Sequence, residues 1–396
     1  MRGGPRMKFP VGLASDILGL SRRDVLSLPA VAALTAGLAA LPSASWALPK
    51  KTLSFPHDAG SHNDFVTEWW YITGYAVGAY TGALKSAAFG FQVTFFRRRV
   101  AATQGMRSRL AAKQLLFAHA AVTDVQGKRL WHDQRIARWS SDAPGNNPAD
   151  LASASAQDTD IVLRDWSLRR VGGDLQAQIP AGDFALKLNF KATQPVLLQG
   201  QDGLSHKGPD EKQASYYYSL PQLQVSGSMV LQGQTIPLRA GSTAWLDHEW
   251  SQEVLHPLAV GWDWMGINLL DGSALTAFQL RDKDGRALWD GGSFRHAGTT
   301  GNAGVKSVFS RGEVLFKAIR HWHSDLSKVS YPVEWTVRTP ADVYTVKAVV
   351  DNQELDSRAS TGAIYWEGLC EVWDSNQTLV GRGYLEMTGY AAALKL

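Results

Sequence analysis

Two carboxylates that lie two residues apart beside aromatic side chains are the strongest chemical signal in this sequence. They occur in GSTAWLDHEW (241–250), where a strand would place Trp245, Asp247 and Glu249 on one face. Burial and mutual repulsion would raise the pKa of at least one carboxyl, so that it could donate a proton near neutral pH. His248 lies on the opposite face and could relay a proton if the strand twists or two domains meet there.

The same spacing also fits a structural role. The two acids could pair with arginines across a domain interface, with the histidine between them hydrogen-bonded to the backbone. Shortly afterwards GWDW (261–264) adds a further acid, Asp263, between Trp262 and Trp264. Spacing alone therefore leaves a catalytic and a structural interpretation of these segments open.

Other groups that could carry chemistry are weaker. HDAGSHND (57–64) offers two histidines and two aspartates as metal ligands, but it reads as a loop and its ligands are not tightly spaced. The sequence has no G-x-S-x-G turn and no glycine-rich phosphate loop, and Cys370, its only cysteine, has no evident catalytic partner. We therefore predict no metal and no cofactor, and a hydrolase with a serine or cysteine nucleophile is not supported.

The N-terminal 47 residues have the pattern of an export signal. SRRDVL (21–26) places twin arginines before a short apolar run, and Ser45 and Ala47 fit a small-residue cleavage site. This segment resembles a twin-arginine signal and predicts a periplasmic or secreted protein. It contains five basic and two acidic residues, so most of the chain's net charge of +4 lies in it. Nucleic-acid binding is therefore not expected.

The remainder of the chain reads as a succession of short strands. Aromatic and β-branched runs are bounded by turns such as LQGQTI and DKDGRAL, and amphipathic helices are scarce. This pattern predicts an all-β protein built from antiparallel barrels or sandwiches. A single cysteine permits no intrachain disulfide, so stability must come from buried cores, and the length favours two of them. We place the domains at residues 48–252 and 253–396.

EWWYITG (68–74) is a further candidate segment. Strand alternation places Trp69 and Tyr71 on one face, and we expect them to line the first barrel. Glu68 would point the other way. We expect it to be a structural anchor at the seam between the domains, paired with a basic side chain, although it remains a candidate for the ligand site.

Taken together, these residues resemble a known family, the AttH-like proteins often described as predicted secreted hydrolases, which are related to carotenoid 1,2-hydratases (hydroxyneurosporene synthases). The resemblance covers roughly residues 53–391. The segments that carry it are, in order, EWWYITG, FGFQVTFF, SYYYSLPQLQVSG, AWLDHEWSQ, GWDWMGINLLDG, YPVEWTV, YWEG and GRGYLEMTGY. It implies two tandem lipocalin-like (calycin-type) antiparallel β-barrel domains.

The resemblance also implies a reaction, the acid-initiated addition of water to a C=C bond of an apolar polyene, isoprenoid or lipid. Asp247 or Glu249 would be the acid, and His248 or Asp263 would position water. The aromatic side chains would line the pocket and stabilise a carbocation. Trp245, Trp262 and Trp264 would stabilise the carbocation, and Trp69 and Tyr71 would line the pocket with them.

Two other functions remain open. The protein could be a non-catalytic lipid or hydrophobic-ligand carrier or chaperone associated with an envelope ABC transporter, with the acids holding the domains together. It could also have a purely structural interdomain seam without a ligand. The basic segment FFRRRV (95–100), expected to be a solvated loop, could contact anionic lipid at a membrane surface. We expect a monomer.

Overall fold

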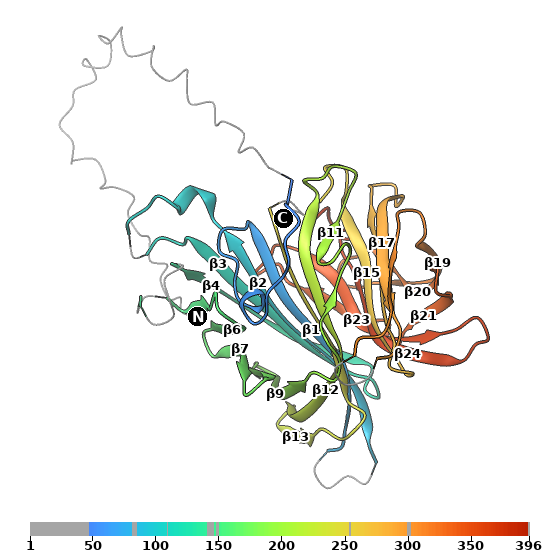
Figure 1. Cartoon of the computed structure of the whole chain (residues 1–396). Coiled ribbons are helices and arrows are strands. Elements are labelled where there is room, and N and C mark those ends of the chain that lie inside the picture. Colours follow the sequence, from blue (N-terminus) through green and yellow to red (C-terminus); the bar gives the residue numbers. More distant parts are fainter. Residues whose placement is uncertain are drawn as a thin grey trace, which may run out of the picture. The chain divides into compact units, whose positions relative to one another are not determined.

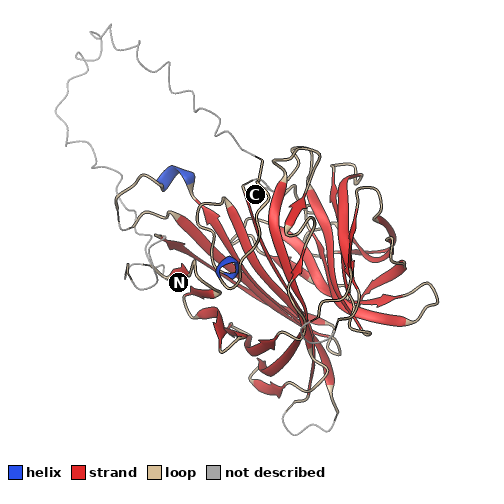
Figure 2. Ribbon diagram, viewed as in Figure 1, coloured by secondary structure: helices blue, strands red, loops and turns tan. Residues whose placement is uncertain are grey.

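A computed structural model gives the fold. The residues that it describes are 47–80, 85–108, 110–140, 146–147, 150–252, 255–298 and 302–394. The predicted export signal lies, apart from Ala47, outside the described residues. The described chain is built from antiparallel strands, with two short 3-10 helices, η1 (His57–Ala59) and η2 (Ala101–Thr103) (Figure 2). Within these ranges no helix has the length and apolar character needed to cross a membrane. The predicted all-β class is confirmed.

The first sheet contains 14 strands among the described residues, in the order β4-β3-β2-β1-β14-β12-β9-β8-β7-β6-β5, with β10, β11 and β13 paired to β12. Because β4 also lies against β5 and β6, the sheet curls into a nearly closed barrel (Figure 1). Its strands are β1 (Thr67–Gly78), β2 (Ala87–Arg99), β3 (Gln114–Asp124), β4 (Arg129–Trp139), β5 (Ala152–Ala154), β6 (Asp160–Leu163), β7 (Trp166–Val171), β8 (Asp174–Pro180), β9 (Phe184–Lys191), β10 (Leu197–Leu198), β11 (Leu204–His206), β12 (Ala214–Leu231), β13 (Gln234–Pro237) and β14 (Thr243–Ser251).

The second sheet contains ten strands among the described residues, in the order β18-β17-β16-β15-β24-β23-β21-β20-β19, with β22 paired to β23. Its two outer strands, β18 and β19, do not pair, so it forms a half-barrel. Together the two sheets confirm the predicted tandem lipocalin-like fold. The strands of the second sheet are β15 (Gly261–Leu269), β16 (Ala274–Arg281), β17 (Ala287–Arg295), β18 (Lys306–Phe309), β19 (Leu315–His323), β20 (Ser330–Arg338), β21 (Val343–Ala348), β22 (Glu354–Asp356), β23 (Ile364–Trp373) and β24 (Leu379–Met387).

Strand alternation gives β1 two buried faces. Trp70 and Ile72 enter the core of the first sheet, where they join Leu246 of the neighbouring β14. Tyr71 of β1 and Trp245 of β14 point the other way and belong to a separate aromatic cluster that includes residues of the second sheet. Both faces are apolar because one fills a barrel and the other packs between the sheets.

Strand β12 differs from its prediction. SYYYSL and QVSGSMVL read as two strands, but they form one strand of 18 residues with an irregular register between Leu220 and Leu223. Gln222 occupies this bulge with a φ of 55°. Its amide donates hydrogen bonds of 2.9 Å each to the carbonyls of Leu269, at the end of β15, and Ser273, in the turn before β16. The bulge therefore ties the two sheets together, as bulges that redirect a side chain often do.

Candidate functional site

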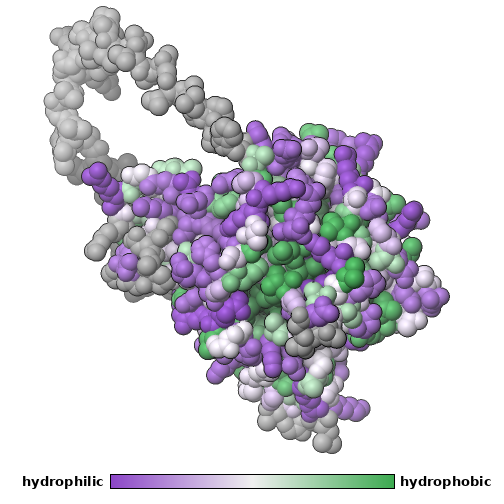
Figure 3. All heavy atoms as spheres, in the orientation of Figure 1, coloured by the Kyte–Doolittle hydropathy of each residue, from purple (hydrophilic) through white to green (hydrophobic). Residues whose placement is uncertain are grey.

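A cavity of about 130 Å³ lies between the two sheets. Strands β1, β2 and β14 contribute to one side, and β15, β16, β23 and β24 contribute to the other. On the face shown in Figure 3, apolar side chains gather in a hollow surrounded by hydrophilic ones. Much of the cavity lining is aromatic, including Trp69, Phe96, Tyr217, Trp262, Trp264 and Phe278. An aromatic cavity with a few polar groups is typical of a small-molecule site.

Asp247 is held on β14 by three hydrogen bonds. Its Oδ1 accepts from the Ser219 hydroxyl at 2.5 Å and the Trp245 indole at 2.7 Å, and its Oδ2 accepts from the Tyr217 hydroxyl at 2.9 Å. Burial raises the pKa of Asp247 to about 7, against the opposing effect of these three donors. The carboxyl is therefore fixed in position and able to exchange a proton near neutral pH.

Glu249 lies two residues further along the same face and has a cationic partner. Its Oε1 accepts a hydrogen bond of 2.5 Å from Ser215 and lies 3.1 Å from the Lys207 ammonium. That ammonium also sits 4.8 Å from the centre of the Tyr217 ring and 4.6 Å from that of Phe278. The charge of Glu249 is thus balanced within the cavity wall.

Two further acids, Glu367 and Glu386, face this cavity from the second sheet. They are register partners on β23 and β24, so their side chains are neighbours. Burial raises the pKa of Glu386 to about 8, with contributions from the charges of Asp247 and Glu249. Burial and the nearby Glu386 also hold the pKa of Glu367 well above its usual range. Because two close carboxyls cannot both ionise cheaply, the pair retains a proton at neutral pH.

Two polar atoms at this end of the cavity lack hydrogen bonds of good geometry. They are the Tyr71 hydroxyl and Oε1 of Glu367, in side chains that are only 6% and 3% exposed. Burial raises the pKa of Tyr71, and the nearby acids act in the same direction, so its hydroxyl stays protonated. Tyr71 is also the register partner of Asp247, which places the two side chains next to each other on one face.

The aromatic residues predicted to bind a ligand gather around this cavity. Trp69, Trp262 and Trp264 line it, and Trp245 packs beside Trp264. A side chain at Gly266 would lie 2.5 Å from the Trp264 ring and 3.0 Å from that of Trp245, so this close approach requires glycine.

The prediction that Trp69 and Tyr71 line the first barrel is wrong. Both side chains face the space between the sheets, because Trp70 and Ile72 on the opposite face already fill the barrel core. The alternation was predicted correctly, but the sequence did not indicate which face is inward.

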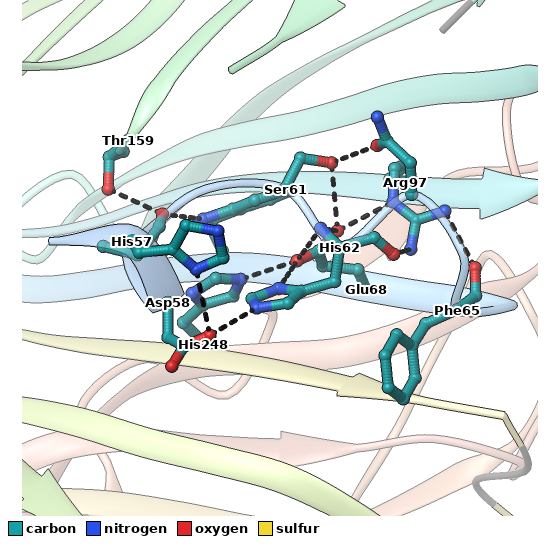
Figure 4. Close-up of polar contacts among 12 residues, drawn as sticks. His57, Asp58, Ser61, His62, Phe65, Glu68, Arg97, Thr159 and His248 are labelled. Carbon is teal, nitrogen blue, oxygen red and sulfur yellow. Dashed lines mark hydrogen bonds and ion pairs between the residues drawn. The ribbon is translucent and has the colours of Figure 1, made fainter. Parts of the chain in front are cut away.

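Glu68 lies on the barrel side of β1, at the centre of a polar network (Figure 4). Its Oε2 accepts from Nε of Arg97 at 2.7 Å, while Oε1 lies 2.7 Å from Nδ1 of His62 and 2.9 Å from Nε2 of His248. The charge of Arg97 and the two imidazoles hold the pKa of Glu68 well below its usual range despite full burial, and burial lowers the pKa of His248 to about 4.

This network corrects two predictions. Glu68 is paired with a basic side chain, as expected, but inside the first sheet rather than at the seam. FFRRRV was expected to be a solvated loop, but residues 95–99 belong to β2, and Arg97 is buried in the ion pair with Glu68.

The side chains around Glu68 also have the composition of a metal site, since His62, Glu68 and His248 offer ligand atoms within 4.8 Å of one another. However, Arg97 already supplies positive charge to the carboxylate at 2.7 Å. The His62 ring also stacks on Trp250, with ring centres 3.8 Å apart. The donor set therefore fits a carboxylate that holds its neighbours by hydrogen bonds better than it fits a metal site.

Asp263 lies apart from the cavity acids. It forms an ion pair of 2.7 Å with Arg281 and accepts hydrogen bonds from Gln279 and Tyr390, at 2.8 and 3.0 Å. Alternation on β15 turns it away from the cavity, toward the core of the second sheet. Of the four acid–base candidates from the sequence, the structure places Asp247 and Glu249 together in the cavity and separates His248 and Asp263 from them.

Sequence reasoning missed Glu367 and Glu386, although a signal was present. YWE (365–367) and YLE (384–386) repeat the pattern of WLD (245–247), an aromatic residue followed two positions later by an acid. In a strand these two residues share a face. Because all three segments lie within otherwise apolar strands, they could have been predicted to line one site together.

The chain is similar to known proteins over most of its length. A family model described as AttH-like matches residues 46–390. The crystal structure of an AttH protein from Nitrosomonas europaea is similar, with a TM-score of 0.76 and 43% sequence identity, over 87% of this chain and 99% of that one.

Two fungal proteins are more distantly similar. Kievitone hydratase from Nectria haematococca superposes with a TM-score of 0.63 at 13% identity, over 86% of this chain and 94% of that one, which shows a shared fold. The dehydratase asqC of Emericella nidulans is 26% identical over 170 residues, or 42% of this chain. The match spans 46% of the dehydratase, about half of its length.

The network around Glu68 predicts a stability effect. Glu68→Gln is expected to lower the free energy of unfolding by about 3–5 kcal/mol, because Arg97 would stay buried without its anion. Urea denaturation followed by fluorescence measures this change. Asp165→Asn, with a side chain 57% exposed, is the control and should shift stability by less than about 0.5 kcal/mol. Equal stability of the two variants would refute the anchoring role.

The cavity acids predict a pH dependence of stability. Between pH 7 and 8.5 the native protein holds protons on Glu367 and Glu386 that the unfolded chain has already released, since their native pKa values are raised. The free energy of unfolding should therefore fall as the pH rises, by on the order of 1 kcal/mol per pH unit for each retained proton. Histidines that are buried in the neutral form make the free energy of unfolding rise with pH, but only below about pH 6.5, where the unfolded chain protonates them.

Urea denaturation in steps of half a pH unit tests this slope. Glu386→Gln should make the slope shallower by the share of one retained proton, because the amide does not ionise while Glu367 stays buried. A free energy of unfolding that rises over this range would contradict the protonation of the pair.

Proposed function

The chain belongs to the AttH-like family, and from that premise we propose that it is an enzyme that adds water to, or removes it from, a carbon–carbon double bond of an apolar or amphipathic molecule. The observation that carries the proposal is the convergence of Asp247, Glu367 and Glu386, all with raised pKa values, in one aromatic cavity. Perturbed acids in a cavity are typical of catalytic sites. The hydratase and dehydratase functions of the similar fungal proteins support the same reaction class.

The environments of the acids suggest separate roles. Asp247 accepts three hydrogen bonds, which favour its ionised form, so it is suited to act as the base toward water or a substrate proton. The pair of Glu367 and Glu386 retains a proton and is suited to act as the acid. Acids whose surroundings differ in this way can divide donor and acceptor roles at one pH.

The proposed roles predict a loss of turnover. Asp247→Asn and Glu386→Gln should each lower kcat/KM by about 10²–10⁴-fold, the usual contribution of a positioned acid or base. Hydration or dehydration is followed by mass spectrometry on a panel of alkenes and alcohols. Asp263→Asn, whose buried side chain lies outside the cavity, is the control for neutralising a buried acid elsewhere in the fold. If the cavity variants turned over every accepted substrate like the wild type, the assignment of the acids would fail.

The pH dependence of the rate provides a separate prediction. A base with a pKa of about 7 and an acid with a pKa of about 8 should give a bell-shaped profile of kcat/KM with its maximum between these values. Glu386→Gln should remove the alkaline limb from the residual activity. A profile that is flat from pH 5 to 9 would contradict this division of roles.

A carrier of hydrophobic ligands is the second candidate, favoured by the aromatic lining of the cavity and by the ion pair of Glu249 with Lys207. For a carrier, neutralising the acids would lower the melting temperature and leave ligand affinity unchanged. An envelope transporter would then be the partner. The twin-arginine pattern in residues 1–47 supports either function outside the cytoplasm.

A further inference from the structure

We infer that the substrate carries a carbonyl group conjugated to its double bond, and that Tyr71 and Glu367 bind the carbonyl oxygen. This inference rests on the proposed function and narrows its substrate class. In this version the enzyme adds water to a conjugated double bond instead of protonating an isolated alkene. The reverse reaction is the loss of water from the adduct.

The first observation is that two neighbouring buried polar atoms are incompletely hydrogen-bonded. The Tyr71 hydroxyl and the carboxyl of Glu367 lie close enough to shift each other's pKa, yet the hydroxyl and Oε1 are inaccessible to solvent and make no hydrogen bond of good geometry to the described residues. An unsatisfied buried polar group is unfavourable, so such groups in a native protein require an explanation. Both residues line the cavity, where a ligand atom could satisfy them.

The second observation is the kind of hydrogen bond that these groups offer. The Tyr71 hydroxyl keeps its proton, because burial and nearby acids disfavour the phenolate. Glu367 is favoured in its neutral form by burial and by Glu386. The site therefore presents two neutral donors, which complement an acceptor oxygen on the ligand. A tyrosine beside a protonated carboxylic acid is suited to stabilise the negative charge that develops on a carbonyl oxygen.

The third observation is the position of the base. Tyr71 and Asp247 are directly opposed on β1 and β14, so their side chains lie side by side in the cavity wall. A substrate whose oxygen contacts Tyr71 would therefore hold its conjugated carbons near Asp247. An isolated alkene would leave both donors unpaired, which disfavours its binding.

The reaction balances without any further reagent. Asp247 takes a proton from water, the water oxygen bonds to the β-carbon, and the π electrons of the double bond shift toward the carbonyl. Glu367 gives its proton to the carbonyl oxygen and an enol forms. Asp247 then returns its proton to the α-carbon while the enol proton goes back to Glu367. The product is a β-hydroxy ketone, and the reverse sequence is a dehydration.

Three probes with one carbon skeleton test the inference. They are 4-phenylbut-3-en-2-one, its saturated analogue 4-phenylbutan-2-one, and 1-phenylbut-1-ene, which lacks the oxygen. Binding is measured by calorimetry and by quenching of tryptophan fluorescence. Both ketones should bind about tenfold more tightly than the hydrocarbon, as expected for a recovered hydrogen bond. Equal affinity for all three probes would overturn the inference.

Substitution of the donors separates a specific contact from a structural role. Tyr71→Phe should raise the Kd for the ketones about tenfold and leave the Kd for the hydrocarbon unchanged. Infrared spectra should show the C=O stretch of the bound ketone lowered in the wild type and partly restored in this variant. Tyr75→Phe, on the same strand outside the cavity lining, should behave like the wild type. An equal loss for all three probes in Tyr71→Phe would overturn the inference.

A second variant and a turnover measurement complete the test. Glu367→Gln keeps a donor, so it should retain the preference for ketones while losing hydration of the enone. If the protein hydrates isolated alkenes but shows no ketone preference, the inference fails and the proposed function stands. If it prefers ketones but hydrates no alkene under any condition, the proposed function fails and the oxygen-binding contact stands.

Discussion

The chemistry available to this protein depends on the cost of removing carboxyl groups from water. Besides Glu68, whose carboxylate is held on the barrel side of β1, four acids line the cavity between the sheets, and Lys207 lies directly against one of them. The remaining three have raised pKa values because burial disfavours their ionised forms. On the other face of β1, Glu68 is equally buried but is held ionised by Arg97. A buried carboxyl is thus ionised and structural where a cation lies beside it, as at Glu68. It keeps its proton where no cation lies beside it, as at Glu367 and Glu386.

Strand alternation is what allows two such different environments to lie so close. On β1 and β14 successive side chains enter the first barrel and the cavity in turn, so His248 and Asp247 are adjacent in sequence and unrelated in role. On the barrel side, stacked rings and hydrogen bonds enclose the carboxylate of Glu68. On the cavity side, the buried Tyr71 hydroxyl and Oε1 of Glu367 lack hydrogen bonds of good geometry. A site of this kind needs a rigid scaffold, which the paired strands provide.

Much of the fold could be predicted from the sequence because strands leave a local pattern. Alternation and glycine-containing turns predicted the all-β class and the shared face of Asp247 and Glu249. The sequence did not indicate which face of a strand is inward, since both faces of β1 are apolar, and Trp69 and Tyr71 were placed on the wrong side for that reason. Nor did it indicate that β23 and β24 line the same cavity as β14, because these strands lie more than a hundred positions apart in the chain. For this reason Glu367 and Glu386 were not predicted as site residues.

The second sheet ends in two strands, β18 and β19, that do not pair with each other. An open edge with free backbone groups is a template on which strands of another copy can add. On β19 the exposed side chains include Lys317 and Arg320, the latter ion-paired with Glu334 and Asp351, and charged groups on an edge strand oppose such addition because they would have to leave water. The half-barrel therefore carries its own protection against growth into a continuous intermolecular sheet, and loss of these charges would expose the protein to aggregation.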